Sequence, residues 1–365
     1  MHNFQYQANA ANVIFGSGTI HRLPSELKRL GLHSPLLLST SQQVSQAEHI
    51  KAALKSQVAG IFAGAVMHTP VEVTGEAIKA ARASGCDSLI SIGGGSTIGL
   101  GKAISFRTGL YHLAIPTTYA GSEATPILGE TEHGRKTTRS DSKILPGTII
   151  YDVDLTMTLP ASMSTVSGIN AIAHAVDALQ ARNGNPIVSL MAQQGIKALV
   201  QSLPIIHQDP SNHDARSKAL YGAWLCGMCL GSVGMSLHHK LCHTLGGSFN
   251  LPHAETHAII LPHALAYNAP EITGVMAILD ALLPSDDGDA IQGFNQLLER
   301  LEIKRDLKSF GFQEGDIAKA ADIACINPYW NPRQVEKPLI QELLRRAWAG
   351  EQAKADLQTS CPGGP

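Results

Sequence analysis

A histidine-rich stretch, HHKLCHTLGGSFNLPH at residues 238–253, constrains this chain more than any other segment. It places His239 and His243 four residues apart, and it presents His253 after a glycine break and a proline. Residues with this spacing project from the same face of a helix. The pattern therefore predicts imidazoles that converge from separate segments, as they do in metal sites and in proton-transfer sites.

Upstream, the segment NAIAH repeats the same spacing with Asn170 and His174. Asn170 is a neutral amide at the position where a metal site of this layout would have a carboxylate. Three imidazoles without a carboxylate hold Zn²⁺ or Fe²⁺ less firmly, although all-histidine zinc sites exist. We therefore expect no resident metal, while ligand number alone leaves metal binding open.

Length and charge restrict the class of protein. A chain of 365 residues exceeds the size at which single hydrophobic cores stop growing, which predicts two domains. A formal charge of −2 argues against binding to nucleic acid or to an anionic membrane surface. The sequence shows no signal-peptide pattern and no apolar run of membrane-spanning length, so we expect a cytoplasmic protein. The cysteine spacing suggests no disulfide framework, and we interpret Cys226 and Cys229 as buried core thiols.

Residues 1–158 alternate short apolar runs with helix-like segments, as at Val71–Ser84, which ends at Gly85. The runs typical of strands are Pro35–Thr40, Ile61–Val66, Ser88–Ile92, His112–Ile115 and Thr148–Val153. This alternation predicts an N-terminal α/β dinucleotide-binding domain, with a parallel sheet covered by helices on both faces.

Residues 159–365 have few strand signals and are rich in Ala and Leu. The helix-like segments lie around 160–181, 186–203, 214–246, 255–268 and 333–349. We predict an all-α C-terminal domain, with the boundary near Asp154–Pro160.

A glycine-rich loop joins an apolar strand to a helix in SLISIGGGSTIGLGKAI, residues 88–104. Its residues are Gly93, Gly94, Gly95, Ser96 and Thr97. Consecutive glycines let backbone N–H groups approach a phosphate, and the helix N-terminus adds a favourable dipole. The spacing is not that of a nucleoside-triphosphatase P-loop, since Ala103 follows Lys102 where Ser or Thr is required. We interpret the loop as the pyrophosphate site of a dinucleotide cofactor.

A second loop, IPTTYAGSEATP, follows another strand and offers Thr117, Thr118 and Ser122 to a ribose or phosphate. The strand PLLLST ends at Thr40 without an acidic residue. An acid at this point would bind the ribose 2′-hydroxyl and repel a 2′-phosphate. We therefore expect both NADH and NADPH to serve as cofactor.

Together these motifs resemble the iron-containing alcohol dehydrogenase superfamily, which includes glycerol dehydrogenase and dehydroquinate synthase relatives. The resemblance covers roughly residues 4–346 and rests on NVIFGSG, GGGSTIGLGKAI, IPTTYAGSEATPI, SKILPGTIIYDVDLTMTLP, SGINAIAHAVDA, LHHKLCHTLGG, LPHAETHAIILPHALAYNAP and NPYWNPR. It implies a dinucleotide-binding domain followed by an all-helical domain, with the active site in the cleft between them. The similarity is greatest to a reductase branch, which implies NAD(P)H-dependent reduction of the C=C bond of a small unsaturated keto dicarboxylate. We also expect a homodimer.

Carried over by position, the resemblance places the family's metal Asp at Asn170 and its metal histidines at His174, His239 and His253. The family's further active-site histidine corresponds to His243.

The same resemblance places the pyrophosphate loop at residues 93–96 and the second cofactor loop at Thr117 and Thr118. It implies that Lys143 lies near the nicotinamide ribose. The acidic residue usual in the GGGSxxD loop is Gly99 in this chain. Loss of both acids suits the reductase branch, which is not expected to need the metal.

Hydride addition to the carbon β to a carbonyl gives an enolate, which histidine can stabilise and protonate. We predict His243 as the proton donor or enolate stabiliser, with His253 in support. Lys240 would add positive charge for a dicarboxylate, and Tyr329 and Arg333 are weaker candidates. The remaining nearby histidines are interpreted as structural: His238, His257 and His263.

Two other enzyme classes stay open at this stage. One is a Zn- or Fe-dependent alcohol or polyol dehydrogenase, and the other is a lyase similar to dehydroquinate synthase, which uses NAD transiently. A non-enzymic nucleotide sensor is disfavoured, because a sensor has no need of four converging histidines.

Overall fold

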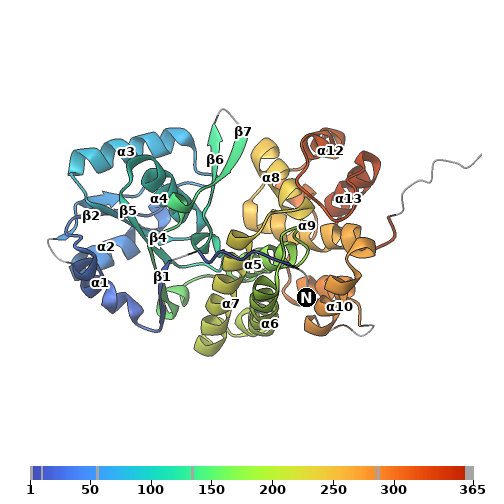
Figure 1. The fold of residues 1–365 in the computed structure, drawn as a ribbon, viewed down its shortest axis with the longest axis horizontal. Coiled ribbons are helices and arrows are strands. Elements are labelled where there is room, and N and C mark those ends of the chain that lie inside the picture. Colours follow the sequence, from blue (N-terminus) through green and yellow to red (C-terminus); the bar gives the residue numbers. More distant parts are fainter. Residues whose placement is uncertain are drawn as a thin grey trace, which may run out of the picture.

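The computed structural model describes residues 3–357, except for 10, 55–56, 133–134, 284 and 286–287. Figure 1 shows an α/β region built from the first part of the chain beside a helical region built from the rest.

A six-stranded parallel sheet forms the centre of the α/β region, in the order β1-β8-β5-β4-β2-β3. Its strands are β1 (Asn12–Gly16), β2 (Pro35–Leu38), β3 (Gly60–Phe62), β4 (Ser88–Gly93), β5 (Tyr111–Pro116) and β8 (Thr148–Asp152). Each of the five predicted runs overlaps a strand, although in Ile61–Val66 the overlap with β3 ends at Phe62. The apolar-run criterion missed β1 and an antiparallel hairpin of β6 (Ile127–Glu132) and β7 (Arg135–Ser140), whose strands are largely polar.

Helices cover both faces of the sheet because successive strand side chains point to opposite sides. Leu37 and Ile90 pack with α1 (Leu23–Leu30) and α2 (Val44–Leu54). Leu36 and Leu89 pack with α3 (Val71–Ser84) and α4 (Gly95–Thr108). The arrangement confirms the predicted α/β class.

The helical region is built around α5 (Ala161–Leu179), whose residues are nearly all buried from Ser164 to Ala178. The other helices are α6 (Pro186–Gln208), α7 (His213–Ser232), α8 (Leu237–Phe249), α9 (His253–Asn268), α10 (Thr273–Leu282), α11 (Ala290–Arg300), α12 (Ile317–Cys325) and α13 (Lys337–Ala349). Within the described ranges no strand follows β8, which confirms the all-α class of this region.

A buried arginine ties the connection between the two regions to α7. Arg216 donates to the carbonyl oxygens of Thr156, at 2.6 Å, and Leu159, at 2.9 Å. Both carbonyls lie between β8 and α5. Because these bonds satisfy a buried charge, they fix where α5 begins relative to the end of the sheet.

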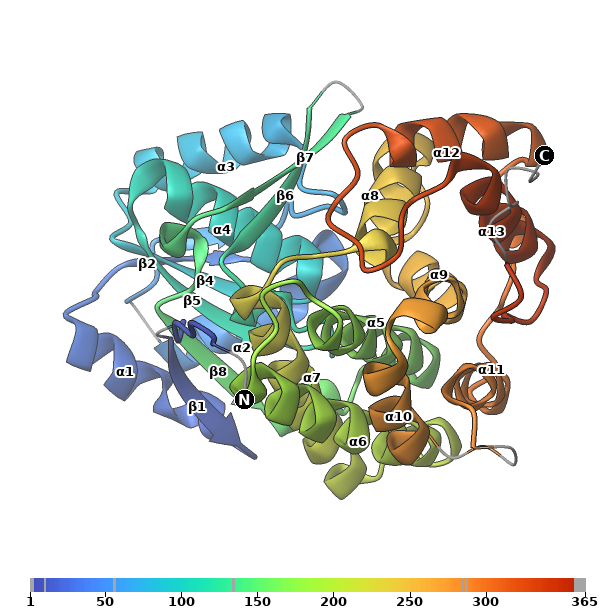
Figure 2. The same ribbon diagram turned by 45° about the vertical axis from the view of Figure 1, so that its right-hand side comes forward.

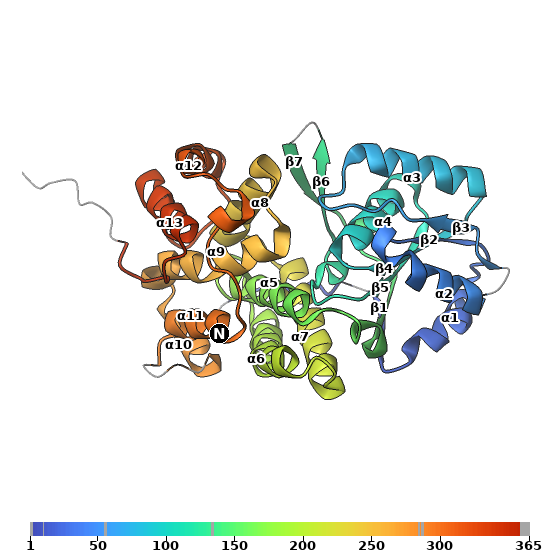
Figure 3. The same cartoon turned by 180° about the vertical axis from the view of Figure 1, so that it is seen from behind.

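Helix α8 lies beside the β6–β7 hairpin, as Figures 2 and 3 show from two directions. The α/β region thus faces the helical region, whose helices α5 and α8 lie on the side toward the sheet and the hairpin. This arrangement brings the predicted cofactor loops opposite the predicted histidine helices.

Among the described residues, no single helix is both long and apolar enough to cross a membrane. Helices α7 and α8 meet the criterion only as a pair, and a bend of 98° separates them.

Candidate active site

One cavity of about 870 Å³ is lined by residues of both regions. It extends from the carboxyl ends of β2, β4 and β5 to α5, α8 and α9. The sequence-predicted residues that line it are Thr40, Gly94, Gly95, Ser96, Thr117, Thr118, Ser122, Asn170, His174, His239, His243 and His253. The structure therefore joins the predicted cofactor loops and the predicted histidines in one space, while the role of each residue stays a prediction.

Gly93 and Gly94 of the glycine-rich loop have no room for side chains. A Cβ added to Gly93 would lie 2.6 Å from Gln43 Oε1 and 2.8 Å from Thr97 Oγ1, and Gly93 has a φ of +147°. A Cβ on Gly94 would lie 2.9 Å from Thr118 Cγ2. Helix α4 begins directly after Gly94, so its N-terminal N–H groups and dipole are available to a phosphate.

A buried lysine that the sequence reading did not select links the two cofactor loops. The Lys102 ammonium, on α4, donates to the Ser122 carbonyl, to Thr125 Oγ1 at 3.0 Å and to the Ile127 carbonyl at 3.0 Å. Burial lowers the pKa of Lys102 to about 7, while the nearby Glu123 opposes this shift. Its three acceptors hold the second loop against the helix that follows the first.

Four predicted cofactor or substrate residues do not line the cavity. Gly93 and Thr97 belong to the glycine loop but do not line the cavity, and Thr97 is fully buried. Lys143 lies in a short 3-10 helix after β7, where its backbone N–H donates to Asp141 Oδ1 at 2.9 Å.

Lys240 also points away from the cavity. Its ammonium donates to the carbonyl oxygens of Ile326, at 3.0 Å, and Asn327, at 3.3 Å, just beyond α12. The weaker candidate Arg333 is also occupied, because it donates to the carbonyls of Tyr267 and Leu357. This geometry does not support the predicted role of Lys240 toward a dicarboxylate, which stays a prediction, because the side chain leaves α8 between two inward histidines and points outward.

The predicted histidines converge from three helices. The ring centroids of His174, on α5, and His239, on α8, lie 5.3 Å apart, and those of His239 and His243 lie 5.9 Å apart. His253, the first residue of α9, lines the same cavity. Burial lowers the pKa of His174 well below its usual value, so this imidazole is neutral and presents a lone pair.

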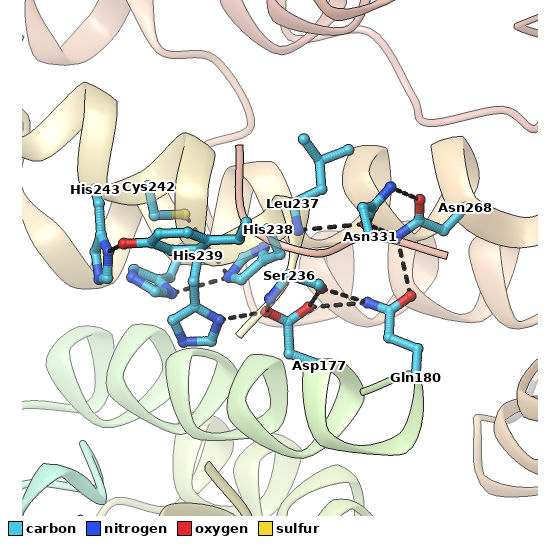
Figure 4. A network of polar contacts seen from close by, with 12 residues as sticks. Asp177, Gln180, Ser236, Leu237, His238, His239, Cys242, His243, Asn268 and Asn331 are labelled. Carbon is cyan, nitrogen blue, oxygen red and sulfur yellow. Dashed lines mark hydrogen bonds and ion pairs between the residues drawn. The ribbon is translucent and has the colours of Figure 1, made fainter. Parts of the chain in front are cut away.

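A buried carboxylate holds His239 in one orientation. Asp177 Oδ2 lies 2.6 Å from His239 Nδ1, and Asp177 also accepts bonds from Ser236 and Gln180 (Figure 4). Burial alone would raise the pKa of Asp177, but His239 and these donors hold that pKa well below its usual value. A carboxylate that accepts the Nδ1 proton leaves His239 Nε2 as a lone pair, which is the common arrangement behind a metal-binding histidine. Asp177 escaped the sequence analysis, although it lies three residues after His174 and seven after Asn170 on the same helix face.

Two histidines interpreted as structural belong to the cluster. His257 has ring-centroid distances of 4.3 Å to His253 and 5.2 Å to His239. Its Nδ1 lies 2.9 Å from His238 Nε2. Burial lowers the pKa of both rings, that of His238 to about 3. The signal for His257 was present in the sequence, since it follows His253 at the same four-residue spacing.

His243 is oriented from the other side of the cleft. Its Nδ1 lies 3.0 Å from the Tyr329 hydroxyl, which also bonds with Thr138 of the β6–β7 hairpin. Burial raises the pKa of Tyr329, so the phenol stays protonated. The tyrosine therefore connects the hairpin, the loop after α12 and the predicted proton donor.

Comparison with known proteins identifies the family. Residues 10–153 match the model described as iron-containing alcohol dehydrogenase, and residues 164–348 match the C-terminal model of the Fe-containing alcohol dehydrogenase family. The chain belongs to the iron-containing alcohol dehydrogenase family.

Within this family the chain is similar to reductases. It is 50% identical over 350 residues to the maleylacetate reductase of Rhizobium sp. (strain MTP-10005), covering 96% of this chain and 99% of that protein. The crystal structure of maleylacetate reductase from Agrobacterium tumefaciens is also 50% identical and superposes with a TM-score of 0.91, covering 96% of this chain and all of the other. An iron-containing alcohol dehydrogenase from Corynebacterium glutamicum is 40% identical, with a TM-score of 0.90 and 98% of both chains covered.

Family membership corrects one prediction. The sequence suggested that no metal would be bound, because Asn170 replaces the expected carboxylate. That expectation conflicts with a chain matched along most of its length by models of an iron-containing family. Position 170 lacks an anion, but Asp177 supplies an anionic charge that acts on the same site through His239.

The residues present fit a metal. Within the described part of the chain, Asn170 Oδ1, His174 Nδ1 and His239 Nε2 are buried without a hydrogen-bond partner. Leaving such atoms unsatisfied costs about 1–3 kcal/mol each, and a cation would satisfy lone pairs on all three. His174, His239 and His253 are the residues that would hold the ion, with the amide oxygen of Asn170 as a weaker ligand.

Gly94→Val should block cofactor binding, because its side chain would overlap Thr118 and fill the approach to the α4 N-terminus. We expect the KM for NADH to rise more than tenfold, a loss of at least about 1.4 kcal/mol. Steady-state kinetics with varied NADH measure this. Gly75→Val, on α3 with open space around its Cβ position, is the matched control. An unchanged KM in a folded Gly94→Val variant would contradict this placement of the cofactor.

Asp177→Asn should weaken metal binding, because His239 would lose the anionic acceptor that fixes its tautomer. We expect the Kd for Co²⁺, followed by its absorption spectrum, to rise about 10- to 100-fold. Elemental analysis of the purified protein gives a second readout that is independent of activity. Asp154→Asn, at a half-exposed surface position, should change neither measurement. Equal Co²⁺ affinity in wild type and Asp177→Asn would contradict the role of Asp177 in orienting His239 toward a metal.

Proposed function

We propose that this protein is a maleylacetate reductase, which uses NAD(P)H to reduce the C=C bond of maleylacetate and yields 3-oxoadipate. The observation that carries the proposal is the single cavity lined by a pyrophosphate loop at one end and by His174, His239, His243 and His253 at the other. The similarity to proteins named maleylacetate reductase, over nearly the whole chain, supports the same reaction. It also agrees with the reductase branch that the sequence motifs indicated.

When bound, NAD(P)H supplies the hydride, which adds to the carbon β to the substrate's ketone. The electron pair of the C=C bond then moves to the ketone oxygen as an enolate, and a proton returns to carbon. Imidazole groups at the cavity wall can donate hydrogen bonds to that oxygen and transfer the proton. Because Tyr329 fixes the ring of His243, this histidine is held in one orientation for the transfer.

When bound, a metal ion supplies Lewis acidity toward a substrate oxygen. The residues that would hold it come from α5, α8 and the start of α9. The neutral imidazole of His174 presents a lone pair, and Asp177 orients the ring of His239. His243 is not one of the family's metal histidines, so it is available for proton transfer.

The cofactor end supports use of both NADH and NADPH. Thr40 follows β2 and lines the cavity, and the next lining residues are Gln42, Gln43 and Ser45. None of these is acidic, so nothing in this group repels a 2′-phosphate.

We further propose that the enzyme acts in the cytoplasm, as a homodimer, in the degradation of aromatic compounds. The consumption of NAD(P)H supports the compartment, and the substrate named for its relatives supports the pathway class. Strand β1 supports a dimer, because it lies at an edge of the sheet, where a strand of a second copy can be added.

His243→Ala should lower kcat for maleylacetate about 10²- to 10⁴-fold, the usual contribution of general acid catalysis. The KM for NADH should stay nearly unchanged. NADH absorbance with wild type and variant measures both, and oxidation of a polyol with NAD⁺ tests the dehydrogenase alternative in the same preparation.

The control is His213→Ala, whose ring pairs with Asp154 at the surface. His238→Ala is unsuitable, because His238 is buried and bonded to His257. Near-normal kcat in His243→Ala would move the proton donor to His253 or Tyr329. A wild-type enzyme that oxidises polyols and ignores maleylacetate would refute the proposed function.

Thr40→Asp should selectively depress the use of NADPH, because a carboxylate at the end of β2 would repel the 2′-phosphate and accept a bond from a 2′-hydroxyl. Thr40→Asn, of similar size and neutral, is the control. The ratio of kcat/KM for NADPH and NADH measures the effect. Equal losses with both cofactors would show that Thr40 does not face the ribose.

A further inference from the structure

The cavity has few groups that can bind an anionic substrate. Its lining contains no arginine in the described part of the chain, and its one lysine, Lys102, is bound to the Ser122 carbonyl, Thr125 and the Ile127 carbonyl. Maleylacetate carries two carboxylates. Hydrogen-bond donors for them must therefore come largely from imidazoles, hydroxyls and backbone N–H groups.

Two of the lining residues adopt an unusual backbone conformation. His68 has a φ of +66° and Thr69 a φ of +47°, which places two consecutive non-glycine residues in the left-handed region. Such strained residues cluster at ligand-binding sites. A β-branched threonine in this region is rarer still.

The neighbouring structure holds this turn in place. Thr131, on β6, donates its N–H to the Thr69 carbonyl at 3.3 Å, and it forms a parallel bridge with Pro70. The Pro70 carbonyl oxygen accepts a hydrogen bond from the N–H of Thr74, in the first turn of α3, at 3.1 Å. The strained turn is therefore pinned between the hairpin and a helix, and both of its residues line the cavity.

The turn faces the catalytic helix. His68 Cε1 lies 3.5 Å from the position of a Cβ on Gly246, which is on α8 three residues after His243. In Figure 3 the hairpin beside this turn stands directly opposite α8. His68 is thus an imidazole of the α/β region placed across the cleft from the imidazoles of the helical region.

The neighbouring turn residue accounts for the glycine at position 99. A Cβ on Gly99 would lie 2.5 Å from Thr69 Oγ1, so a side chain there would displace the turn. An acidic residue would also bring negative charge next to any bound carboxylate. Gly99 and the turn are therefore compatible with each other and with an anionic ligand.

We propose that His68, held by the left-handed turn, binds one carboxylate of the substrate and makes the enzyme selective for dicarboxylates. This inference rests on the proposed function for the identity of the substrate. The other carboxylate and the ketone oxygen then face the histidines of α8 and α9.

The test uses His68→Ala with two readouts. Loss of a hydrogen bond to a charged group should raise the KM for maleylacetate about tenfold to a hundredfold, with kcat and the KM for NADH changed by less than about threefold. Calorimetric titration of maleate into the enzyme with NADH should show the same loss of affinity. His68→Gln, which keeps a donor of similar reach, should lose less. The control is Val66→Ala, two residues earlier in the chain, because Val66 is 46% exposed and does not line the cavity, so it should change neither value.

The outcomes separate the two proposals. If wild type reduces maleylacetate and His68→Ala keeps its maleate affinity, the carboxylate site is refuted and the function stands. If wild type binds maleate through His68 but does not reduce maleylacetate, the site stands and the function is refuted. If the KM for NADH in His68→Ala rises as much as the KM for maleylacetate, the variant has lost structure in general, and the assignment of a carboxylate site to His68 is overturned. The same measurements on His68→Gln check that the chain still folds with a substitution at this position.

Discussion

The buried contact between Asp177 and His239 is the interaction on which the active-site end depends. A carboxylate and an imidazole held 2.6 Å apart, with neither exposed to solvent, need further donors to be stable. Ser236 and Gln180 provide them, and Gln180 is itself bonded to Asn268, which fixes the relative position of α5, the start of α8 and the end of α9. The network sets the tautomer of His239, and it also determines where three helices meet.

The cofactor end of the cavity depends on the close approach of side chains to the backbone of the glycine loop, and less on charge. Gly93 and Gly94 leave room for the side chains of Gln43, Thr97 and Thr118, which pack directly against the backbone of the glycine loop. Thr117 N–H donates to the Gly93 carbonyl at 3.0 Å, and Lys102 ties the second loop to α4. A sheet edge and a helical cluster thus contribute opposite walls of one cavity, each rigid for a different physical reason.

In the candidate metal site the negative charge lies behind a histidine and not on a residue that would contact the metal. Asn170 removes an anion from the innermost position, and the sequence alone suggested that the metal was lost with it. In the structure an anion remains behind His239, and His257 adds an imidazole beside His253 and His239. The donor set is less negative than one with an inner carboxylate, yet it still presents buried lone pairs that a cation would satisfy.

Local patterns in the sequence determined the alternation of strands and helices, the glycine loop and the faces that carry His174, His239 and His243, because these follow from periodicity within one element. Only the tertiary structure decided which groups meet across elements. Lys240 points to the carbonyls after α12, Tyr329 reaches His243 from 86 residues away, and His68 approaches α8 from the opposite region. Such contacts depend on how whole helices and loops pack, which no local spacing encodes. Asp177 and His257 belong to both groups. Their spacing from His174 and His253 can be read in the sequence, but their burial and their hydrogen-bond partners depend on how the helices pack.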